Sequence, residues 1–183
     1  MGLDMYLTKR TYVGNKYRKP KQMVKVVIPK DQDGVVFPTR GIKTNRINSI
    51  TESVGYWRKA NQVHKWFVDN VQEGVDDCRE YAVDTEQLKE LKETCEKVIA
   101  SLKDSPTKKV SIETGWNKDG KTYEEIDVFT NTAIAEELLP TAQGFFFGGE
   151  EYDKWYLKDL EDTVAICEQA IKEGGDFYYD SSW

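Results

Sequence analysis

The chain has 183 residues, of which 39% are hydrophobic, 32% charged and 12% aromatic, a balance typical of a folded globular protein rather than a disordered chain. This length fits one domain spanning residues 1–183, and the net charge of −6 disfavours a duplex nucleic acid partner. No apolar run is long enough to span a membrane and no secretory leader is recognisable, so we expect a cytoplasmic protein.

The first third of the chain is basic and rich in short strand patterns. Leu3, Met5 and Leu7 alternate with polar residues, which predicts a strand. Residues 24–28 and 35–37 predict a hairpin, and residues 42–54 an irregular strand.

Charge is divided unevenly along the chain. Residues 1–51 contain 11 Lys or Arg and 3 acidic residues, a net +8, while the remainder carries −14. The basic segment forms either an anion-binding surface or intramolecular ion pairs with acidic helices, and we favour the ion pairs.

The best-marked helix is predicted between Val54 and Val71. Its apolar side chains recur at helical spacing. They are Tyr56, Trp57, Ala60, Val63, His64, Phe67, Val68 and Val71. Trp66 lies outside this stripe, and Arg58 and Asn61 flank it. This helix therefore has more aromatic and hydrogen-bonding side chains than packing alone requires.

The next segment predicts a strand, a helix and a hairpin. Residues 78–83 resemble a short strand, and Asp84 with Gln87 forms a capping-box pattern for a helix that ends before Pro106. The core positions of that helix are Leu88, Leu91, Cys95, Val98 and Leu102. A turn at residues 117–120 joins two strands, 109–116 and 123–129, into a hairpin.

The C-terminal third contains two predicted helices and an aromatic tail. A short helix covers 130–139, and Asp153 caps a longer helix that ends at Gly174. The core stripe of the longer helix is Leu157, Leu160, Val164, Cys167 and Ile171. The tail, 176–183, forms an edge strand or docks on a partner. Together the elements predict a single α+β domain, with a mixed or antiparallel sheet packed against about three main helices.

Three consecutive phenylalanines, 145–147, lie between glycines at positions 144 and 148. This pattern is typical of a buried central strand with a bend at each end, which we favour. The alternative is a loop that brings backbone amides and aromatic rings close to a ligand.

Cysteines and acidic residues give little support for a metal site or a cofactor, and none is expected. The three cysteines are scattered, which indicates reduced thiols, and Cys95 and Cys167 fall on apolar helix stripes. A zinc site from these thiols and His64 lacks the usual ligand spacing. The acids at 150, 151, 153, 159, 161 and 162 suggest a divalent-metal cluster, but interaction with the helix N-terminus is the simpler explanation for some of them.

No sequence motif for a known catalytic mechanism is present. His64, the only histidine, could act as a general base if Asp4, Asp69 or an acid of the last helix oriented it. Its position among apolar residues favours a hydrogen-bonded structural histidine instead.

A binding role has better support, because flat rings accompany planar donors and cations. The candidate ligand-binding residues are Tyr56, Trp57, Arg58, Asn61, His64, Trp66, Phe146, Phe147, Gly148, Tyr152 and Trp155. The alternative is that these rings form a rich core and its rim, the more usual role for such residues.

Several segments together resemble a family of small proteins from phages and prophages. They are Met1–Leu7, Gly55–Phe67, Asp76–Tyr81, Leu139–Gly148 and Tyr152–Asp162. The resemblance covers most of the chain and implies an accessory phage protein in the bacterial cytoplasm, where blocking host defence is a common task. It implies no catalytic residues.

The leading hypothesis is a phage accessory protein, with a counter-defence role, that binds and sequesters a small nucleotide-like ligand without turnover. One alternative is a protein-binding inhibitor of a host factor. The other is a nucleotide hydrolase that uses His64. A homo-oligomer is left open.

Overall fold

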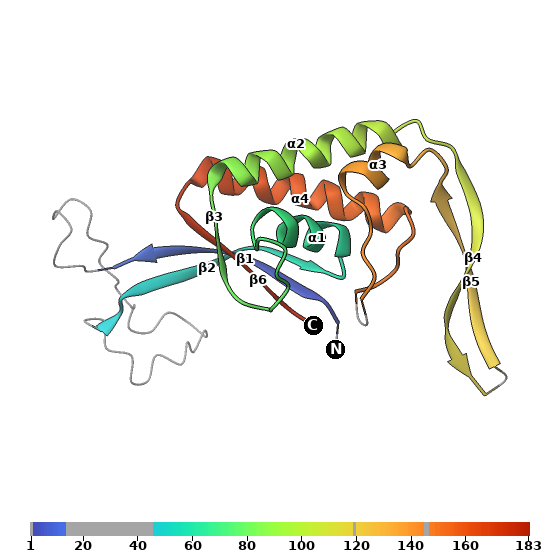
Figure 1. The fold of residues 1–183 in the computed structure, drawn as a ribbon, viewed down its shortest axis with the longest axis horizontal. Helices are drawn as coiled ribbons and strands as arrows, with labels where there is room; N and C mark the ends of the chain where they lie inside the picture. The colour runs from blue at the N-terminus through green and yellow to red at the C-terminus, as the bar shows by residue number, and fades with distance from the viewer. Residues whose placement is uncertain (1, 14–45, 119, 145–146) are drawn as a thin grey trace, which may run out of the picture.

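The fold is built on a four-stranded antiparallel sheet with the order β2-β1-β6-β3 (Figure 1). The computed structural model describes residues 2–13, 46–118, 120–144 and 147–183. The strands are β1 (Asp4–Tyr12), β2 (Ser49–Arg58), β3 (Tyr81–Val83) and β6 (Asp176–Ser182). Because β1 and β6 lie inside the sheet, the two ends of the chain together supply its centre.

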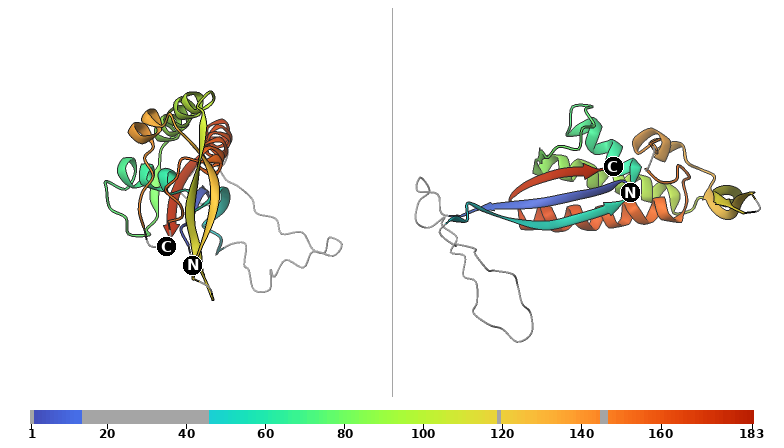
Figure 2. Two further views of the ribbon diagram at one scale, coloured as in Figure 1. Left: turned by 90° about the vertical axis from the view of Figure 1, so that its right-hand side faces the viewer. Right: turned by 90° about the horizontal axis from the view of Figure 1, so that it is seen from below.

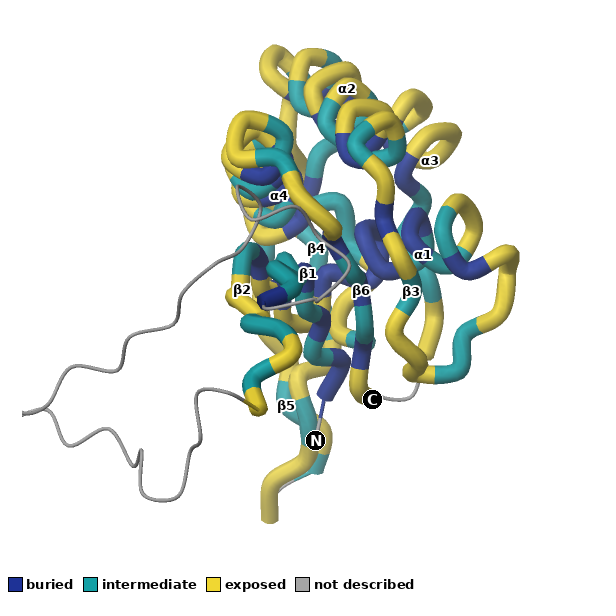
Figure 3. Tube along the Cα trace, turned by 90° about the vertical axis from the view of Figure 1, so that its left-hand side faces the viewer, coloured by how far each residue is buried: buried dark blue, intermediate teal, exposed yellow. Residues whose placement is uncertain are grey.

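One face of the sheet carries the core. On β1, Met5 and Leu7 are fully buried, and Leu7 pairs with the equally buried Tyr179 of β6. The helices α1 (Asn61–Asn70), α2 (Thr85–Leu102) and α4 (Lys154–Glu173) cover this face. Figure 2 shows α2 and α4 side by side behind the strands, and Figure 3 shows buried residues concentrated between the layers. The α+β class predicted from the sequence is confirmed.

The two long helices begin where the sequence predicts. The Asp84 carboxylate accepts from the Gln87 backbone N–H at 2.8 Å, while the Gln87 side chain accepts from the Asp84 backbone N–H at 2.9 Å. The Asp153 Oδ1 accepts from the backbone amides of Trp155 and Tyr156 at 2.8 and 3.0 Å. All five predicted core positions of α2 are buried. Local capping chemistry thus sets both helix starts.

A two-stranded ribbon, β4 (Thr107–Asn117) with β5 (Gly120–Phe129), extends away from the body (Figure 1). Its base is held to the body where the Phe129 N–H donates to the Tyr152 carbonyl at 2.8 Å. The short helix α3 (Ala133–Leu138) follows it. The hairpin and the short helix predicted from the sequence are confirmed.

The predicted helix from Val54 to Val71 is wrong over its first part. Residues up to Arg58 belong to β2, where Trp57 pairs with Met5 of β1. Lys59 then adopts φ 62°, a left-handed conformation that turns the chain into α1 at Asn61. An apolar run of this length satisfies helical and strand periodicity alike, and pairing with β1 decides between them.

The C-terminal tail is not the edge strand that its sequence predicts. β6 pairs with β1 on one side and β3 on the other, so its backbone is enclosed by the sheet. Phe177 and Tyr179 point into the core at 1% and 0% exposure. Pairing partners far away in the sequence determine this interior place, which local alternation cannot reveal.

Two basic residues of the N-terminal segment form ion pairs with acidic residues elsewhere in the chain. Lys9 contacts Glu173 at 3.3 Å and Arg10 contacts Glu80 at 2.6 Å. These contacts agree with the favoured expectation of intramolecular pairing. The predicted hairpin of 24–28 and 35–37, and the basic residues from Lys16 to Lys43, lie outside the described residues.

The predicted burial of Cys95 and Cys167 is confirmed, and Cys78 is exposed. Burial raises the pKa of the Cys167 thiol to about 12, which keeps it protonated. Among the described helices, none is long and apolar enough to cross a membrane.

Truncating the chain after Gly175 should abolish cooperative folding. The deletion removes Phe177 and Tyr179, and losing one large buried aromatic side chain typically costs about 3–5 kcal/mol. The combined loss is comparable with the total stability of about 5–15 kcal/mol of a typical domain. Thermal unfolding followed by circular dichroism measures the effect. Removing only Trp183, which is 49% exposed, should preserve a sharp transition, whereas a sharp transition in the longer truncation would contradict the interior role of β6.

Candidate functional site

The sequence-predicted binding residues do not form one site. Some belong to a cluster around His64 and others line a surface pocket at the end of β2, while the rest lie in neither. We call these the His64 cluster (His64, Asp76, Phe147, Tyr179 and Trp183) and the Arg58 pocket, whose lining is given below.

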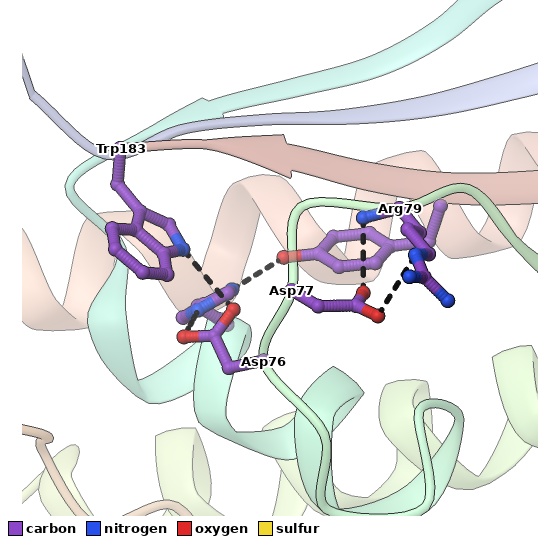
Figure 4. Close-up of polar contacts among 6 residues, drawn as sticks. Asp76, Asp77, Arg79 and Trp183 are labelled. Carbon is purple, nitrogen blue, oxygen red and sulfur yellow. Dashed lines mark hydrogen bonds and ion pairs between the residues drawn. The ribbon is translucent and has the colours of Figure 1, made fainter.

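The His64 cluster ties α1 to the last strand and to the loop before β3. His64 Nε2 lies 3.0 Å from Asp76 Oδ2, and Nδ1 lies 2.7 Å from the Tyr179 hydroxyl. The second Asp76 oxygen accepts from the Trp183 indole N–H at 3.1 Å (Figure 4). The Phe147 ring and the imidazole are perpendicular, with 5.2 Å between ring centroids. These contacts fix the imidazole from several sides.

The hydrogen bonds of the His64 cluster indicate which ring nitrogen of His64 carries a hydrogen when the imidazole is neutral. An ionised carboxylate only accepts, so Nε2 carries the hydrogen directed at Asp76. In neutral imidazole, Nδ1 then accepts from Tyr179, whose pKa is raised well above its ordinary value by burial. With His64 1% exposed, the cluster fits the favoured expectation of a hydrogen-bonded structural histidine. The orienting acid is Asp76, which the sequence reasoning did not consider.

The Arg58 pocket lies between the end of β2, the start of α4 and the ribbon, and its volume is about 370 Å³. This is within the range of about 300–1,000 Å³ typical of small-molecule sites. Its lining residues are Arg58, Lys59, Gln62, Ile112, Ile126, Thr141, Gly148, Gly149, Glu151, Asp153, Trp155, Tyr156 and Asp159.

A second, more open hollow lies between α2 and α4 and has a volume of about 300 Å³. Its lining is mostly charged, and Lys92 there pairs with Glu96 and Glu168 at 2.8 and 3.3 Å. Three of its five charged side chains, those of Lys89, Lys92 and Glu168, form ion pairs within the molecule, so this hollow resembles an ordinary solvated surface between two helices.

Two cations line the Arg58 pocket without a carboxylate partner. Neither Arg58 nor Lys59 forms an ion pair with any residue that the structure describes. Lys59 also holds a left-handed backbone conformation, which is unfavourable for a residue with a side chain and is enriched at binding sites. Gly148 packs against it so closely that an added Cβ would lie 2.9 Å from the Lys59 Cβ.

Asn61 holds Ala142, Phe147 and Gly149 against the pocket. Its amide nitrogen donates to the carbonyl oxygens of Gly149 at 2.8 Å and Phe147 at 3.3 Å, and its oxygen accepts from the Ala142 N–H at 2.9 Å. The side chain is 1% exposed. A buried amide with its hydrogen bonds satisfied in this way locks loop geometry, so Asn61 shapes the pocket from behind.

Asp159 is an unusual acid at this pocket. Burial raises the pKa of the Asp159 carboxyl to about 6. The hydrogen bond that Gln62 donates to it, at 3.2 Å, has the opposite effect and lowers the pKa. No described residue forms an ion pair with it. A partly desolvated acid without a cation costs folding free energy and is a common feature of functional sites.

The candidate residues have different roles in the structure. Arg58, Gly148 and Trp155 line the pocket, and Trp155 is 65% exposed. Trp57 is core, with its indole N–H donating to Thr163 at 2.9 Å, and Trp66 is buried at 6% exposure although the helical pattern predicted it outside the stripe.

The remaining candidates lie apart from the pocket lining. Tyr152 packs edge-on against Tyr156, with ring centroids 4.8 Å apart. Tyr56 donates its hydroxyl to Asp4 at 2.5 Å. Phe146 lies outside the described residues. The strand predicted over the three phenylalanines is described only at Phe147, and neither Phe147 nor the preceding Gly144 belongs to a strand.

The sequence reasoning missed Lys59, Gln62 and Tyr156 as pocket residues, and it considered Asp159 only as a metal ligand. Among the described residues, no group of three or more His, Cys, Asp or Glu is arranged to hold a metal ion. No sequence signal marks Asp159, because the buried face of α4 runs through Tyr156 and Thr163 instead of the predicted Leu157 and Val164.

Comparisons of the chain with protein-family models, curated proteins and solved structures found no match.

Replacing Asn61 with alanine should loosen the backbone at Ala142, Phe147 and Gly149 and destabilise the protein by about 2 kcal/mol, because three buried hydrogen bonds are lost. Urea denaturation measures the stability, and hydrogen exchange at Ala142 should accelerate. Asn70→Ala is the matched control, since its side chain bonds only to Trp66 of its own helix. Equal effects of the two substitutions would contradict the clamp.

Replacing Asp159 with asparagine should stabilise the protein at pH 7.5 by about 1 kcal/mol. Its folded pKa of about 6 exceeds the ordinary 3.8, so the folded state binds more protons than the unfolded state between these values. Wild-type stability therefore decreases as pH rises from about 4 to 6, and the variant should lack this component. Urea denaturation at pH 4 and 7.5 measures it. The exposed Asp162→Asn should give no gain, and a less stable Asp159→Asn at pH 7.5 would contradict the assignment.

Proposed function

We propose that this protein binds a small nucleotide-like ligand in the Arg58 pocket and sequesters it without turnover. The observation that carries the proposal is the pair of cations, Arg58 and Lys59, that line a cavity without forming an ion pair among the described residues. Both side chains are exposed to solvent, and an anionic group of a ligand would pair with them. Hydrogen bonds of this kind between ionised groups are stronger than neutral ones.

The pocket also has surfaces suited to a ring. Trp155 presents an exposed indole at one side, and Ile112 and Ile126 of the ribbon contribute apolar side chains. Stacking of a base on an aromatic side chain is worth about 1–3 kcal/mol and tolerates different bases. A ring that also carries a phosphate would use both the apolar and the cationic parts of the lining.

Binding without turnover is favoured over hydrolysis by the position of His64. Both its ring nitrogens are engaged, by Asp76 and Tyr179, and it does not line the Arg58 pocket. A hydrolase that used His64 would have to break these hydrogen bonds before the imidazole could reach a substrate.

The resemblance to phage proteins adds a setting to the proposal. In that setting, the protein acts in the cytoplasm of an infected bacterium and removes a nucleotide signal of host defence from solution. Sequestration requires affinity and abundance but no catalytic group. The pocket lining offers cations and apolar surface for affinity, and it does not include His64.

A second candidate, binding to a host protein, is favoured by the ribbon. Trp116 and Tyr123 are 73% and 60% exposed. Trp116 pairs with Lys121, which lies two residues before Tyr123 on β5, because the bulge between Glu113 and Gly115 adds one residue to β4. Both rings therefore lie on the same face of the ribbon. Exposed aromatic rings are typical of binding hot spots between proteins.

Isothermal titration with AMP, GMP, cyclic dinucleotides and ADP-ribose should detect binding of at least one of them. Arg58→Ala should weaken that binding by about tenfold or more, because a charge-assisted hydrogen bond is lost. Chromatography of the ligand after incubation should recover it unchanged.

A double variant, Trp116→Ala with Tyr123→Ala, is the matched control and should bind the nucleotide as the wild type does. Absence of heat with every nucleotide would refute the proposal, as would full affinity in Arg58→Ala. Conversion of the ligand to a product would refute sequestration without turnover.

A further inference from the structure

The polar side of the Arg58 pocket contains a carboxylate with unused acceptor capacity. Asp159 Oδ2 accepts one hydrogen bond, from Gln62 Nε2 at 3.2 Å, and both residues line the cavity. Gln62 is 3% exposed, so its amide is held in place. An ionised carboxylate accepts up to about four hydrogen bonds, which leaves room on Asp159 for donors of a ligand.

The other acids of the lining also accept hydrogen bonds from the protein. Asp153 caps α4 by accepting from the backbone amides of Trp155 and Tyr156. Glu151 Oε2 accepts from the Glu150 backbone N–H at 3.0 Å. Glu151 therefore accepts as many hydrogen bonds as Asp159 does. Asp159 differs because its donor is the buried side chain of Gln62, which fixes the position of the carboxylate in the lining.

The charge of the lining limits the anionic part of the ligand. Arg58 and Lys59 give two positive charges, against three negative charges when Glu151, Asp153 and Asp159 are all ionised. A lining of mixed sign suits a ligand that carries one phosphate at one end and hydrogen-bond donors at the other. A triphosphate would bring more negative charge than the two cations balance.

Two adjacent N–H donors are the natural complement of a carboxylate with spare lone pairs. Guanine presents such a pair, the ring N1–H and the 2-amino group, on one edge. Hypoxanthine has the ring N–H alone, and the corresponding edge of adenine has an acceptor at N1 beside a single amino group. Bidentate contacts of this type discriminate between bases in nucleic-acid complexes.

We propose that the Arg58 pocket selects guanine nucleotides with a single phosphate, and that Asp159, positioned by Gln62, reads the guanine edge. This inference rests on the proposed binding function and specifies its ligand class. The phosphate lies toward Arg58 and Lys59, and the ring lies against Trp155 and the apolar side chains of the ribbon.

Titration of the full chain at pH 7.5 with GMP, IMP and AMP, each against wild type and Asp159→Asn, tests the proposal. Wild type should bind GMP about tenfold or more tightly than IMP or AMP, since those analogues lack one or both donors. Asp159→Asn should lose most of this preference. Asp162→Asn, on the exposed side of the same helix, should retain the wild-type preference.

The outcomes separate the two proposals. Absence of binding by all three nucleotides and by the wider panel refutes the binding function and this inference together. Equal affinity for the three nucleotides, or a preference for AMP, refutes the guanine assignment and leaves nucleotide binding intact. A GMP preference that persists in Asp159→Asn refutes the role of Asp159. Asparagine is nearly isosteric with aspartate and retains an acceptor for Gln62, so unfolding would not explain a loss of preference.

Discussion

The buried amide of Asn61 is the constraint on which the arrangement of the pocket depends. One side chain at the start of α1 satisfies backbone groups of Ala142, Phe147 and Gly149. These bonds bring a segment eighty residues away to the turn between β2 and α1, where Gly148 packs on Lys59. The helix start, the loop and the cationic edge of the pocket are thereby held as one unit, because each backbone group would otherwise need another partner.

The fold could be predicted from the sequence wherever short-range chemistry decides it. The capping patterns at Asp84 and Asp153, and the hairpin around its turn, depend on residues a few positions apart. The start of α1 and the place of β6 depend instead on pairing with β1, which lies far away in the sequence. The first type of information is contained in a window of residues and the second is not.

The candidate site was less predictable than the fold, and the reason is the burial of polar groups. The aromatic residues of this region are predicted to bind a ligand, yet Trp57 and Trp66 are buried in the core. Gln62 and Asp159 resemble ordinary helix-surface residues in the sequence. They become significant only because the segment before α4 and the ribbon enclose them, and this enclosure is a property of the tertiary structure.

The backbone conformation of Lys59 also has a consequence for engineering. A glycine there would adopt φ 62° without steric cost, so the lysine makes the folded state less stable than it could be by about 1 kcal/mol. A laboratory selection for heat resistance alone would therefore favour glycine at this position. The hardier protein would keep its shape but lose an ammonium group from the pocket lining, a local case of the general trade-off between robustness and activity.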